Sequence, residues 1–264
     1  MKNILIGFIV LSLFSVSALA ENAPTYPKEQ PIADLRINAG WAVGFGPDFF
    51  GSANLEFKHR PVIDIRYKDR LRIFGPKIGY SLFKDGSYTA GPLLNYSFGR
   101  KESDNPILMG LGDNGGHIEL GVFASYKRGP SEFRIEGKSA LGDNAGETLT
   151  LTIMQGLYSG DKISWLMVLR SQLFSQSKMQ SEFGITEQQS AMSVANLSAY
   201  RPSGGISNSN LIVFGEYKLK QNVSLMVVGS FWQLMSDAKN SPLIKSDFGK
   251  DFQSLFATAL IYKF

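Results

Sequence analysis

Alternation between apolar and polar residues, repeated along most of the chain, is the feature that most limits how this sequence can fold. Residues 131–141, SEFRIEGKSAL, place Glu132, Arg134, Glu136 and Lys138 at every second position. A period of two puts successive side chains on opposite faces of a β-strand. Similar runs occupy 33–45, 62–67, 71–83, 88–98, 117–127, 147–157, 162–173, 211–219, 222–234 and 252–264. The chain is therefore predicted to be all-β.

The length and number of these runs predict an antiparallel transmembrane β-barrel. Most runs have about ten residues, which is the length that a tilted strand needs to cross a bilayer. Eleven runs can be recognised, whereas single-chain bacterial barrels have an even number of strands. One strand is therefore missed or one run is split, and the regions 46–85 and 175–207 are the two candidates. We predict 12 strands, with 10 as the alternative.

Aromatic residues at the ends of the apolar faces favour a membrane barrel over a soluble β-sandwich, whose strands also alternate. Outer-membrane barrels carry aromatic girdles at both interfaces. The aromatic residues in question are Trp41, Phe45, Tyr88, Phe98, Tyr126 and Tyr262. The opposite faces carry Asp34, Arg36, Glu119, Glu132, Arg134, Glu136, Lys138, Arg170, Glu216 and Lys218. In a narrow lumen these charges either pair into a stiff interior or line a small selective pore, and the sequence leaves both open.

The first 20 residues are predicted to be a secretory signal peptide. They contain Lys2, an apolar stretch over 4–13 and an A-x-A cleavage sequence at 18–20, which is the order of features in such peptides. An N-terminal membrane anchor is the alternative, but the apolar stretch is short and a polar, proline-rich segment follows it. Residues 21–264 are then expected to form a single barrel domain.

Composition excludes several functional classes. The chain contains no cysteine, which excludes disulfides, thiolate metal sites, cysteine nucleophiles and a lipid-modified cysteine. Its 27 basic and 23 acidic residues give a formal net charge of +4, and no long basic run is present, so no nucleic-acid partner is predicted. After the signal peptide, no stretch of apolar residues is long enough to predict a transmembrane helix.

Two glycine-rich motifs have weak functional interpretations. GLGDNG at 110–115 matches G-x-G-x-x-G, but a dinucleotide site requires a helix after the motif, and here a predicted strand follows. A related LGDNAG occurs at 141–146, so two similar barrel turns are expected. A calcium site from Asp113 and Asp143 is an alternative, although two carboxylates are too few oxygen ligands. We predict no cofactor and no metal site.

The histidines are the remaining candidates for catalysis. Only His59 and His117 are present, while serines are plentiful, so residue inventory alone allows a Ser–His pair. Neither histidine lies in a nucleophile motif, and His117 is expected to be a polar residue facing the lumen at a strand end. We therefore predict no catalytic residues and no enzyme activity.

Groups of glycine, proline and aromatic residues recur in and around the predicted loops. They are Gly46-Pro47-Asp48-Phe49-Phe50-Gly51-Ser52, Pro61 with Tyr67-Lys68-Asp69-Arg70-Leu71, Gly99-Arg100 with Gly110-Leu111-Gly112, Gly184-Ile185-Thr186 with Gln188, Ser193, Tyr200 and Gly204-Gly205, and Ser241-Pro242-Leu243-Ile244. Over essentially the whole mature chain, this pattern resembles the MipA/OmpV family of MltA-interacting proteins and their relatives. Residues 194–196 and Phe49 depart from the more usual family residues at those positions.

The resemblance implies a barrel in the outer membrane of a Gram-negative cell, surrounded by lipid and lipopolysaccharide. Some family members are described as scaffolds that link a lytic murein transglycosylase to a peptidoglycan synthase, and others are associated with adhesion, osmotic response or antibiotic uptake. The resemblance therefore implies a non-enzymatic scaffold. A small passive channel and a surface adhesion or stress-response protein are the alternatives. The motif residues implied to shape loops and turns are Pro47, Asp48, Phe49, Gly51, Ser52, Gly184, Ile185, Thr186, Ser193, Tyr200, Gly204, Gly205, Ser241 and Pro242.

The chain ends in the alternating stretch ATALIYKF at 257–264. Phe256, Leu260, Tyr262 and Phe264 share one face of the strand expected there. This pattern resembles the C-terminal signal that the barrel-assembly machinery recognises, which makes that machinery an expected partner during biogenesis. We also expect this strand to close the barrel against the first one.

Residues 175–207 form a connection that is too long for a barrel turn. Long connections without strands are usually functional or ordered by packing, and in such barrels they are usually extracellular. If this segment plugs the lumen, the scaffold is favoured, and if the lumen is open, the channel is favoured.

Overall fold

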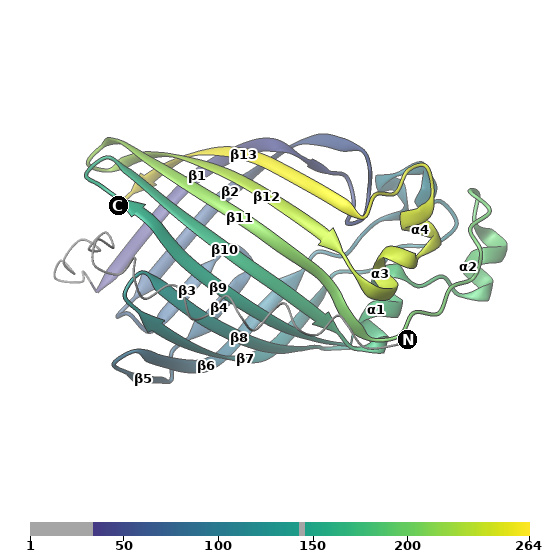
Figure 1. The fold of residues 1–264 in the computed structure, drawn as a ribbon, viewed down its shortest axis with the longest axis horizontal. Coiled ribbons are helices and arrows are strands. Elements are labelled where there is room, and N and C mark those ends of the chain that lie inside the picture. Colours follow the sequence, from purple (N-terminus) through teal and green to yellow (C-terminus); the bar gives the residue numbers. More distant parts are fainter. Residues whose placement is uncertain (1–33, 143–145) are drawn as a thin grey trace, which may run out of the picture.

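The structure is a computed structural model that describes residues 34–142 and 146–264 (Figure 1). The predicted signal peptide and Asp143 lie outside the described residues. The strands are β1 (Leu35–Pro47), β2 (Leu55–Tyr67), β3 (Leu71–Phe74), β4 (Lys77–Tyr80), β5 (Phe83–Asp85), β6 (Tyr88–Ser97), β7 (His117–Arg128), β8 (Ser131–Ala140), β9 (Glu147–Ser159), β10 (Ile163–Phe174), β11 (Gly205–Lys220), β12 (Val223–Leu234) and β13 (Phe252–Lys263). The helices are η3 (Glu102–Asp104), η4 (Pro106–Leu108), α1 (Gln176–Phe183), α2 (Glu187–Met192), α3 (Ser236–Asn240) and α4 (Pro242–Lys245).

The strands close into an antiparallel barrel of 12 strands. β13 pairs with β12 on one side and with β1 on the other, so the last strand closes on the first, as predicted. β4 and β5 both pair with β6, at residues 93–95 and 88–90, and are therefore two parts of one strand. Arg70 holds the interruption between them by donating to the carbonyls of Ser81 and Leu82 at 3.0 and 3.1 Å. The predicted fold class and strand number are confirmed.

The twelfth strand lies in the run 71–83, where the prediction of a single strand is wrong. This run contains two strands, β3 and β4, joined by a hairpin turn at Gly75 and Pro76, where Gly75 has a φ of 53°. Of the two suspect regions, 46–85 therefore held the missing strand. The region 175–207 contains two helices before β11 begins at Gly205.

Two strands begin earlier than their alternation predicted. β2 begins at Leu55 instead of 62, and β11 begins at Gly205 instead of 211. Pro61 does not interrupt β2, because proline is tolerated where its nitrogen faces no neighbouring strand. The alternation does not reveal the start of β11, because residues 205–210 are almost entirely small or polar.

The outer face of the barrel is an apolar belt. Large exposed side chains on eight of the strands include Trp41, Phe57, Val122, Ile135, Leu151, Leu169, Val227 and Leu260. A soluble monomer rarely exposes an apolar surface of this extent, whereas a barrel in hydrocarbon requires it. Closure of the sheet also gives the backbone groups of neighbouring strands hydrogen-bond partners, which hydrocarbon cannot supply. Among the described residues, no helix is long and apolar enough to cross a bilayer.

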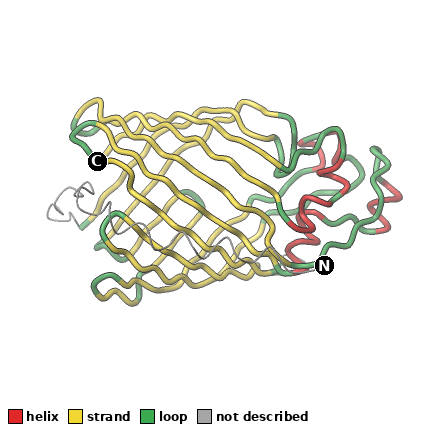
Figure 2. Tube along the Cα trace, in the orientation of Figure 1, coloured by secondary structure: helices red, strands yellow, loops and turns green. Residues whose placement is uncertain are grey.

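The two ends of the barrel differ in their connections. Short turns lie at the end that holds the C-terminus, which we call the turn end. All the helices of the described residues lie at the opposite end, the loop end, with the connections 48–54, 98–116, 175–204 and 235–251 (Figure 2). A ring of tyrosines marks the turn end on the outer face: Tyr67, Tyr88, Tyr126, Tyr158, Tyr217 and Tyr262. Such a ring is an aromatic girdle in both position and chemistry.

Candidate functional site: the loop-end cap and the cavity beneath it

The connections at the loop end pack together into a small apolar core, which we call the cap. Its buried members are Phe49, Ile107, Leu108, Leu111, Phe174, Met179, Phe183, Ile185, Leu197, Leu234, Ala238, Leu243 and Ile244. They come from four loop-end connections and the strand ends that adjoin them, so the cap ties these connections to one another. α1, α3 and α4 sit across this end of the barrel, and α2 projects beyond them (Figure 1). Residues 175–204 therefore cover the end of the lumen and do not run along it.

The first predicted motif folds into the cap directly after β1. Phe49 lies in the cap core, and the carboxylate of Asp48 accepts a hydrogen bond from Asn105 Nδ2 at 2.8 Å. Gly51 has a φ of 109°, and a Cβ there would overlap the side chain of Ile244. Only glycine fits both the backbone conformation and this close approach. Pro47 ends β1 at the edge of the cap.

Gln253 of β13 fixes the same motif to the barrel wall. Its Oε1 accepts from Gly51 N at 2.9 Å, and its Nε2 donates to the Ser52 carbonyl at 2.8 Å. Ser52 is buried and forms an isolated bridge with Gly249. Both amide atoms of the buried Gln253 side chain are thus hydrogen-bonded to the 48–54 connection. Together with the bridge from Ser52 to Gly249, they join the first and last connections of the loop end.

The second motif surrounds α2. Ile185 is buried and exchanges two backbone hydrogen bonds with Tyr200, at 2.9 and 2.8 Å. Thr186 accepts from the N–H of Gln189 at 3.2 Å, which caps α2 at its N-terminus. At the other end of α2, the hydroxyl of Ser193 accepts from the N–H of Leu197 at 3.2 Å. These residues close a compact loop.

The remaining motif residues join this loop to α1, α3 and α4. The Tyr200 hydroxyl donates to the carbonyl of Asp237 at 2.9 Å, and the Ser241 hydroxyl donates to the carbonyl of Phe183 at 2.7 Å. Ser241 is also the N-cap of α4, whose first residue is Pro242. The glycines lie at chain reversals: Gly184 ends α1, and Gly204 and Gly205 lead into β11.

All the predicted loop residues therefore meet in the cap, whereas the predicted assembly residues lie elsewhere. Phe256, Leu260 and Tyr262 are exposed on the outer face of β13. Phe264 follows the end of β13 and packs edge-on against Tyr262, with 4.7 Å between the ring centroids. The structure thus separates an assembled cap at one end from an apolar strand surface on the wall.

Paired charges line the lumen below the cap. The Glu136 carboxylate forms ion pairs with Lys77 Nζ and Arg134 Nε, each at 2.7 Å. Glu119 pairs with Lys138 and accepts from Asn95 Nδ2 at 2.8 Å. The predicted inward position of these four charged residues of β7 and β8 is consistent with their low exposure. α1 joins this network from above, because Lys178 lies 4.0 Å from Glu119 and 2.8 Å from Glu182.

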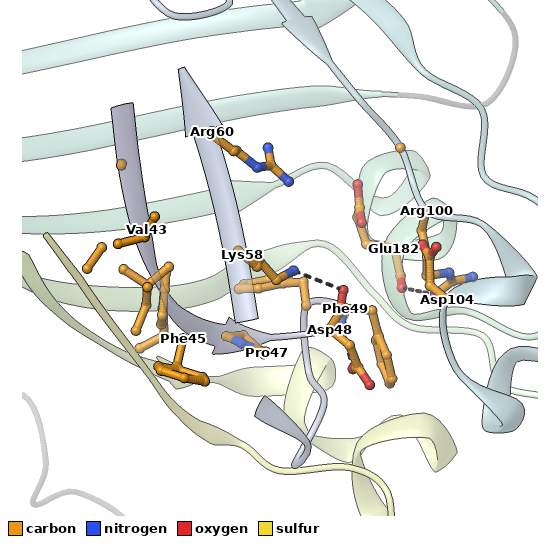
Figure 3. Close-up of a pocket in the computed structure, with 17 residues that line it drawn as sticks. Val43, Phe45, Pro47, Asp48, Phe49, Lys58, Arg60, Arg100, Asp104 and Glu182 are labelled. Carbon is orange, nitrogen blue, oxygen red and sulfur yellow. Dashed lines mark hydrogen bonds between the residues drawn. The ribbon is translucent and has the colours of Figure 1, made fainter. Parts of the chain in front are cut away.

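A cavity of about 480 Å³ lies between this lumen and the cap, beside β1 and β2 (Figure 3). Its charged lining residues are Asp48, Lys58, Arg60, Arg100, Asp104 and Glu182. The three acids already have partners. Asp48 accepts from Asn105 and Glu182 pairs with Lys178, while Asp104 accepts from Lys101 N at 2.9 Å.

The cations of the cavity are less completely paired. Lys58 lies 2.9 Å from Glu56 and donates to the Asp48 carbonyl at 3.3 Å. Arg100 Nη1 donates to the Glu182 carbonyl at 3.3 Å, while its buried Nε has no hydrogen-bond partner among the described residues. Burial lowers the pKa of the Arg100 guanidinium, and the nearby charges of Glu182 and Asp104 oppose that shift. The ion pairs formed by the described residues include neither Arg60 nor Arg100.

Sequence reasoning did not find this cavity. Arg60 lies outside the predicted strand 62–67, and Arg100 belongs only to a Gly-Arg motif. In a strand that begins at Leu55, alternation places Lys58 and Arg60 on the lumen face. No local pattern shows that Arg100 lines the same cavity, since its position depends on the 98–116 connection folding back over the lumen.

The glycine-rich motif at 110–115 is folded around a carboxylate of its own chain. The N–H groups of Gly110 and Gly112 both donate to Glu102 Oε2 at 3.1 Å. Strand β7 follows the motif, as predicted, so the helix that a dinucleotide site needs is absent there. The described residues contain no group of three His, Asp or Glu side chains placed to hold a metal ion, and Asp113 accepts instead from Glu102 N at 2.9 Å.

The two histidines lie on opposite faces of the wall. His59 is on the outer face, where its ring stacks on Trp41 at a centroid distance of 5.7 Å. His117 faces the lumen, with Nε2 3.8 Å from Glu119 and Nδ1 3.2 Å from the Gly115 carbonyl. Within residues 34–142 and 146–264, no hydrogen bond joins either ring to a serine hydroxyl.

Several solved outer-membrane proteins are similar to the chain at low identity. The NanC porin matches with a TM-score of 0.46 and 8% identity, covering 87% of this chain and 100% of that one. An outer membrane channel from Pseudomonas putida F1 matches with a TM-score of 0.47 and 10% identity, over 90% and 99% of the two chains. The translocator domain of autotransporter NalP from Neisseria meningitidis matches with a TM-score of 0.44 and 8% identity, covering 89% of this chain and 90% of that one.

The sequence comparisons are more specific. No curated protein sequence matches the chain. The family described as MltA-interacting protein MipA matches residues 39–264. This range includes the whole cap and every described strand, except the first four residues of β1. This is the family whose motifs the sequence resembles. The chain is therefore a member of the MipA family, with the closed barrel of an outer-membrane protein.

Proposed function

We propose that this protein is a non-enzymatic outer-membrane scaffold that binds a lytic murein transglycosylase through its turn end. The description of its family, MltA-interacting protein, names a protein partner and neither a reaction nor a transported solute. The observation that carries the proposal is the packed cap above an ion-paired lumen. A barrel filled in this way offers its end surfaces for binding more readily than its interior.

The proposed location is the outer membrane of a Gram-negative cell. The apolar belt and the tyrosine girdle support it. In such barrels short turns face the periplasm and longer connections face outward, so the cap would meet lipopolysaccharide and the turn end would meet the cell wall. Residues 21–264 would be the mature protein, and the outer face of β13, with Phe256 and Leu260, would be presented to the assembly machinery.

The turn end has the charge of a docking surface for an acidic partner. Its connections and strand ends carry Arg36, Lys68, Arg70, Lys84, Lys127, Arg128, Lys162, Lys218, Lys220 and Lys263, against Asp34, Asp69, Asp85, Glu132, Asp161 and Glu216. Some of these are paired, such as Lys84 with Asp69 at 3.1 Å. Complementary charge steers association and fixes orientation more than it adds affinity. We therefore expect binding that is fast at low salt and weakens as salt is added.

The test is retention of an MltA-type transglycosylase by the purified full chain in detergent. Reversing two exposed turn-end charges, Lys162→Glu with Lys220→Glu, should slow association by about tenfold at low salt, because electrostatic steering is lost. The matched control reverses two exposed loop-end charges, Lys239→Glu with Lys250→Glu, and should bind like the parent protein. Retention no greater than that of an unrelated barrel would overturn the proposal.

A passive channel and a surface adhesion or stress-response protein are the alternatives. A channel needs a continuous water path, and the ion pairs of the lumen and the cap core both stand against one. An adhesin would act through the cap, so the loop-end charge reversal, and not the turn-end reversal, would abolish its binding. The same pair of variants therefore separates scaffold from adhesin.

A further inference from the structure

The barrel wall is incomplete beside the cavity. β3 pairs with β2 only at residues 64–67, and the last hydrogen bond between them runs from Gly75 N to the Ile63 carbonyl at 3.0 Å. Backbone groups of successive strand residues point to opposite neighbours. On the side where β2 has no partner strand, the backbone groups that point outward from the strand edge therefore belong to Leu55, Phe57, His59 and Pro61.

The far side of this gap is the end of β6. Toward the turn end, the gap is bounded by the tip of the β3–β4 hairpin, where Tyr96 N donates to the Pro76 carbonyl at 3.1 Å. Toward the loop end, it is bounded by the contact between Asp48 and Asn105. Among the described residues, no backbone hydrogen bond joins 55–62 to 97–116. We call this four-sided gap between β2 and the end of β6 the window.

Two inward residues of β2 show what the missing neighbour changes. Asp64 lies beside β3, is only 9% exposed, and pairs with Arg66 at 3.1 Å and with Arg72 at 3.0 Å. Arg60 lies on the same face of the strand but beside the window, where it is exposed. Its guanidinium extends over the ring of Phe98 at 5.9 Å, so it spans the window from β2 to β6.

Behind the window lies the cavity of about 480 Å³, where two guanidinium groups form no ion pair with the described residues. Arg60 and Arg100 both line it (Figure 3). The acids nearby are occupied by other donors, and the buried Nε of Arg100 has no partner among the described residues. A buried donor of this kind is costly unless an acceptor is supplied, and guanidinium groups bind phosphate and carboxylate best.

In front of the window the surface is apolar. Phe98 is 66% exposed and Phe57 is 57% exposed, and both lie on the membrane-facing side of the wall. Ile63 and Tyr96 continue this surface below them. A ligand that fits both sides must carry an anionic group at one end and hydrocarbon at the other.

We propose that the window is a lateral binding site for an anionic amphiphile. Its phosphate or carboxylate head would enter the cavity and meet Arg60 and Arg100, while its acyl chain would remain outside against Phe57 and Phe98. The site goes beyond the scaffold function and shares with it only the membrane location. A partner strand is a poorer occupant, because Pro61 removes a donor from the hairpin end of the free edge, and the hairpin and the cap limit the length of that edge.

The test measures binding of dodecyl phosphate and of laurate to the full chain in dodecyl maltoside, by native mass spectrometry and titration calorimetry. Dodecyl maltoside supplies the same chain without a charge, and inorganic phosphate supplies the head without a chain. We expect one anionic amphiphile bound per chain, and the better of the two heads identifies phosphate or carboxylate as the natural group. Inorganic phosphate should bind at least about tenfold more weakly, because the apolar contacts are missing.

Arg60→Gln should weaken amphiphile binding by about tenfold, as expected for loss of a charge-assisted hydrogen bond. Arg60→Lys should recover part of it, and Arg128→Gln at the turn end should have no effect. Arg60 is exposed, so these variants should fold, which heat-modifiable migration on a gel confirms. Inorganic phosphate binding as tightly as the amphiphiles, or Arg60→Gln binding like the parent protein, would overturn the proposal. The transglycosylase assay does not depend on either outcome.

Discussion

The cap and the lumen beneath it are held together by opposite means. The cap buries side chains such as Phe183 and Met179, like the core of a small soluble domain. A few residues below it, the lumen is built from ion pairs such as Glu136 with Lys77. The wall strands expose their apolar face on the outside of the barrel, so their polar face lines the interior. The cap connections have no such constraint and can turn their apolar side chains inward.

This difference predicts that the cap should be more sensitive to lost volume. Phe183→Ala removes a ring that is 1% exposed and touches several segments of the cap. We expect it to lower the free energy of unfolding of the cap by about 3 kcal/mol or more, through lost burial and a cavity. Limited proteolysis of the loop end in detergent, with denaturant, measures the change.

Val194→Ala is the control for the cap, since Val194 lies in the same connection but is 70% exposed. It should change the stability by less than about 0.5 kcal/mol. If Phe183→Ala behaved like Val194→Ala, the cap would not be a cooperative packed unit.

The lumen should be more sensitive to lost charge. Glu136→Gln keeps the volume but leaves Lys77 and Arg134 without their carboxylate. We expect a loss of about 2 kcal/mol in unfolding free energy, less than for a fully buried pair because Lys77 is partly exposed. Urea unfolding in detergent, followed by heat-modifiable migration, measures it.

Glu56→Gln is the matched change in an exposed pair, that of Glu56 with Lys58. It should cost well under about 1 kcal/mol. Equal effects of the two variants would mean that the lumen pairs are solvated like surface pairs.

The smallest expected effect concerns Tyr200, where the cap is joined by a polar contact. Burial raises the pKa of the Tyr200 phenol above 10.0, and the charge of Asp237 raises it further. In the unfolded chain this phenol ionises first, so its contribution to stability is present below the unfolded pKa and is lost as pH rises above it. Tyr200→Phe should therefore make cap stability less sensitive to pH above about 10.

The measurement is protease resistance of the cap between neutral and strongly alkaline pH. Tyr88→Phe, at the turn end, leaves the cap untouched and serves as the control. Unchanged alkaline sensitivity in Tyr200→Phe would show that the hydrogen bond to the Asp237 carbonyl does not hold the cap.

The wall could be predicted from the sequence because alternation is a local property. Glu132 to Lys138 reveal a strand without any knowledge of its neighbours, and β13 could be expected to close on β1 because a membrane barrel must close. The short β3–β4 hairpin was hidden because neither of its strands is long enough to alternate clearly.

The cap could not be predicted in this way. Residues such as Leu108 and Phe183 follow no period, and their partners lie in distant connections. The family motifs pointed to the right loops, but they gave no sign that Arg60 and Arg100 share a cavity. Their shared position depends on how the 98–116 connection folds over the lumen, which only the folded chain fixes.

The most direct test of the contrast between a sealed cap and an ion-paired lumen is single-channel recording of the full chain in a planar bilayer. Insertion is verified separately, by protease protection of the membrane strands. A barrel whose lumen is filled by ion pairs and covered by the cap should insert and show no stable conductance steps. Steady, reproducible steps from the parent protein would show an open water path and would contradict the proposed scaffold in favour of a channel.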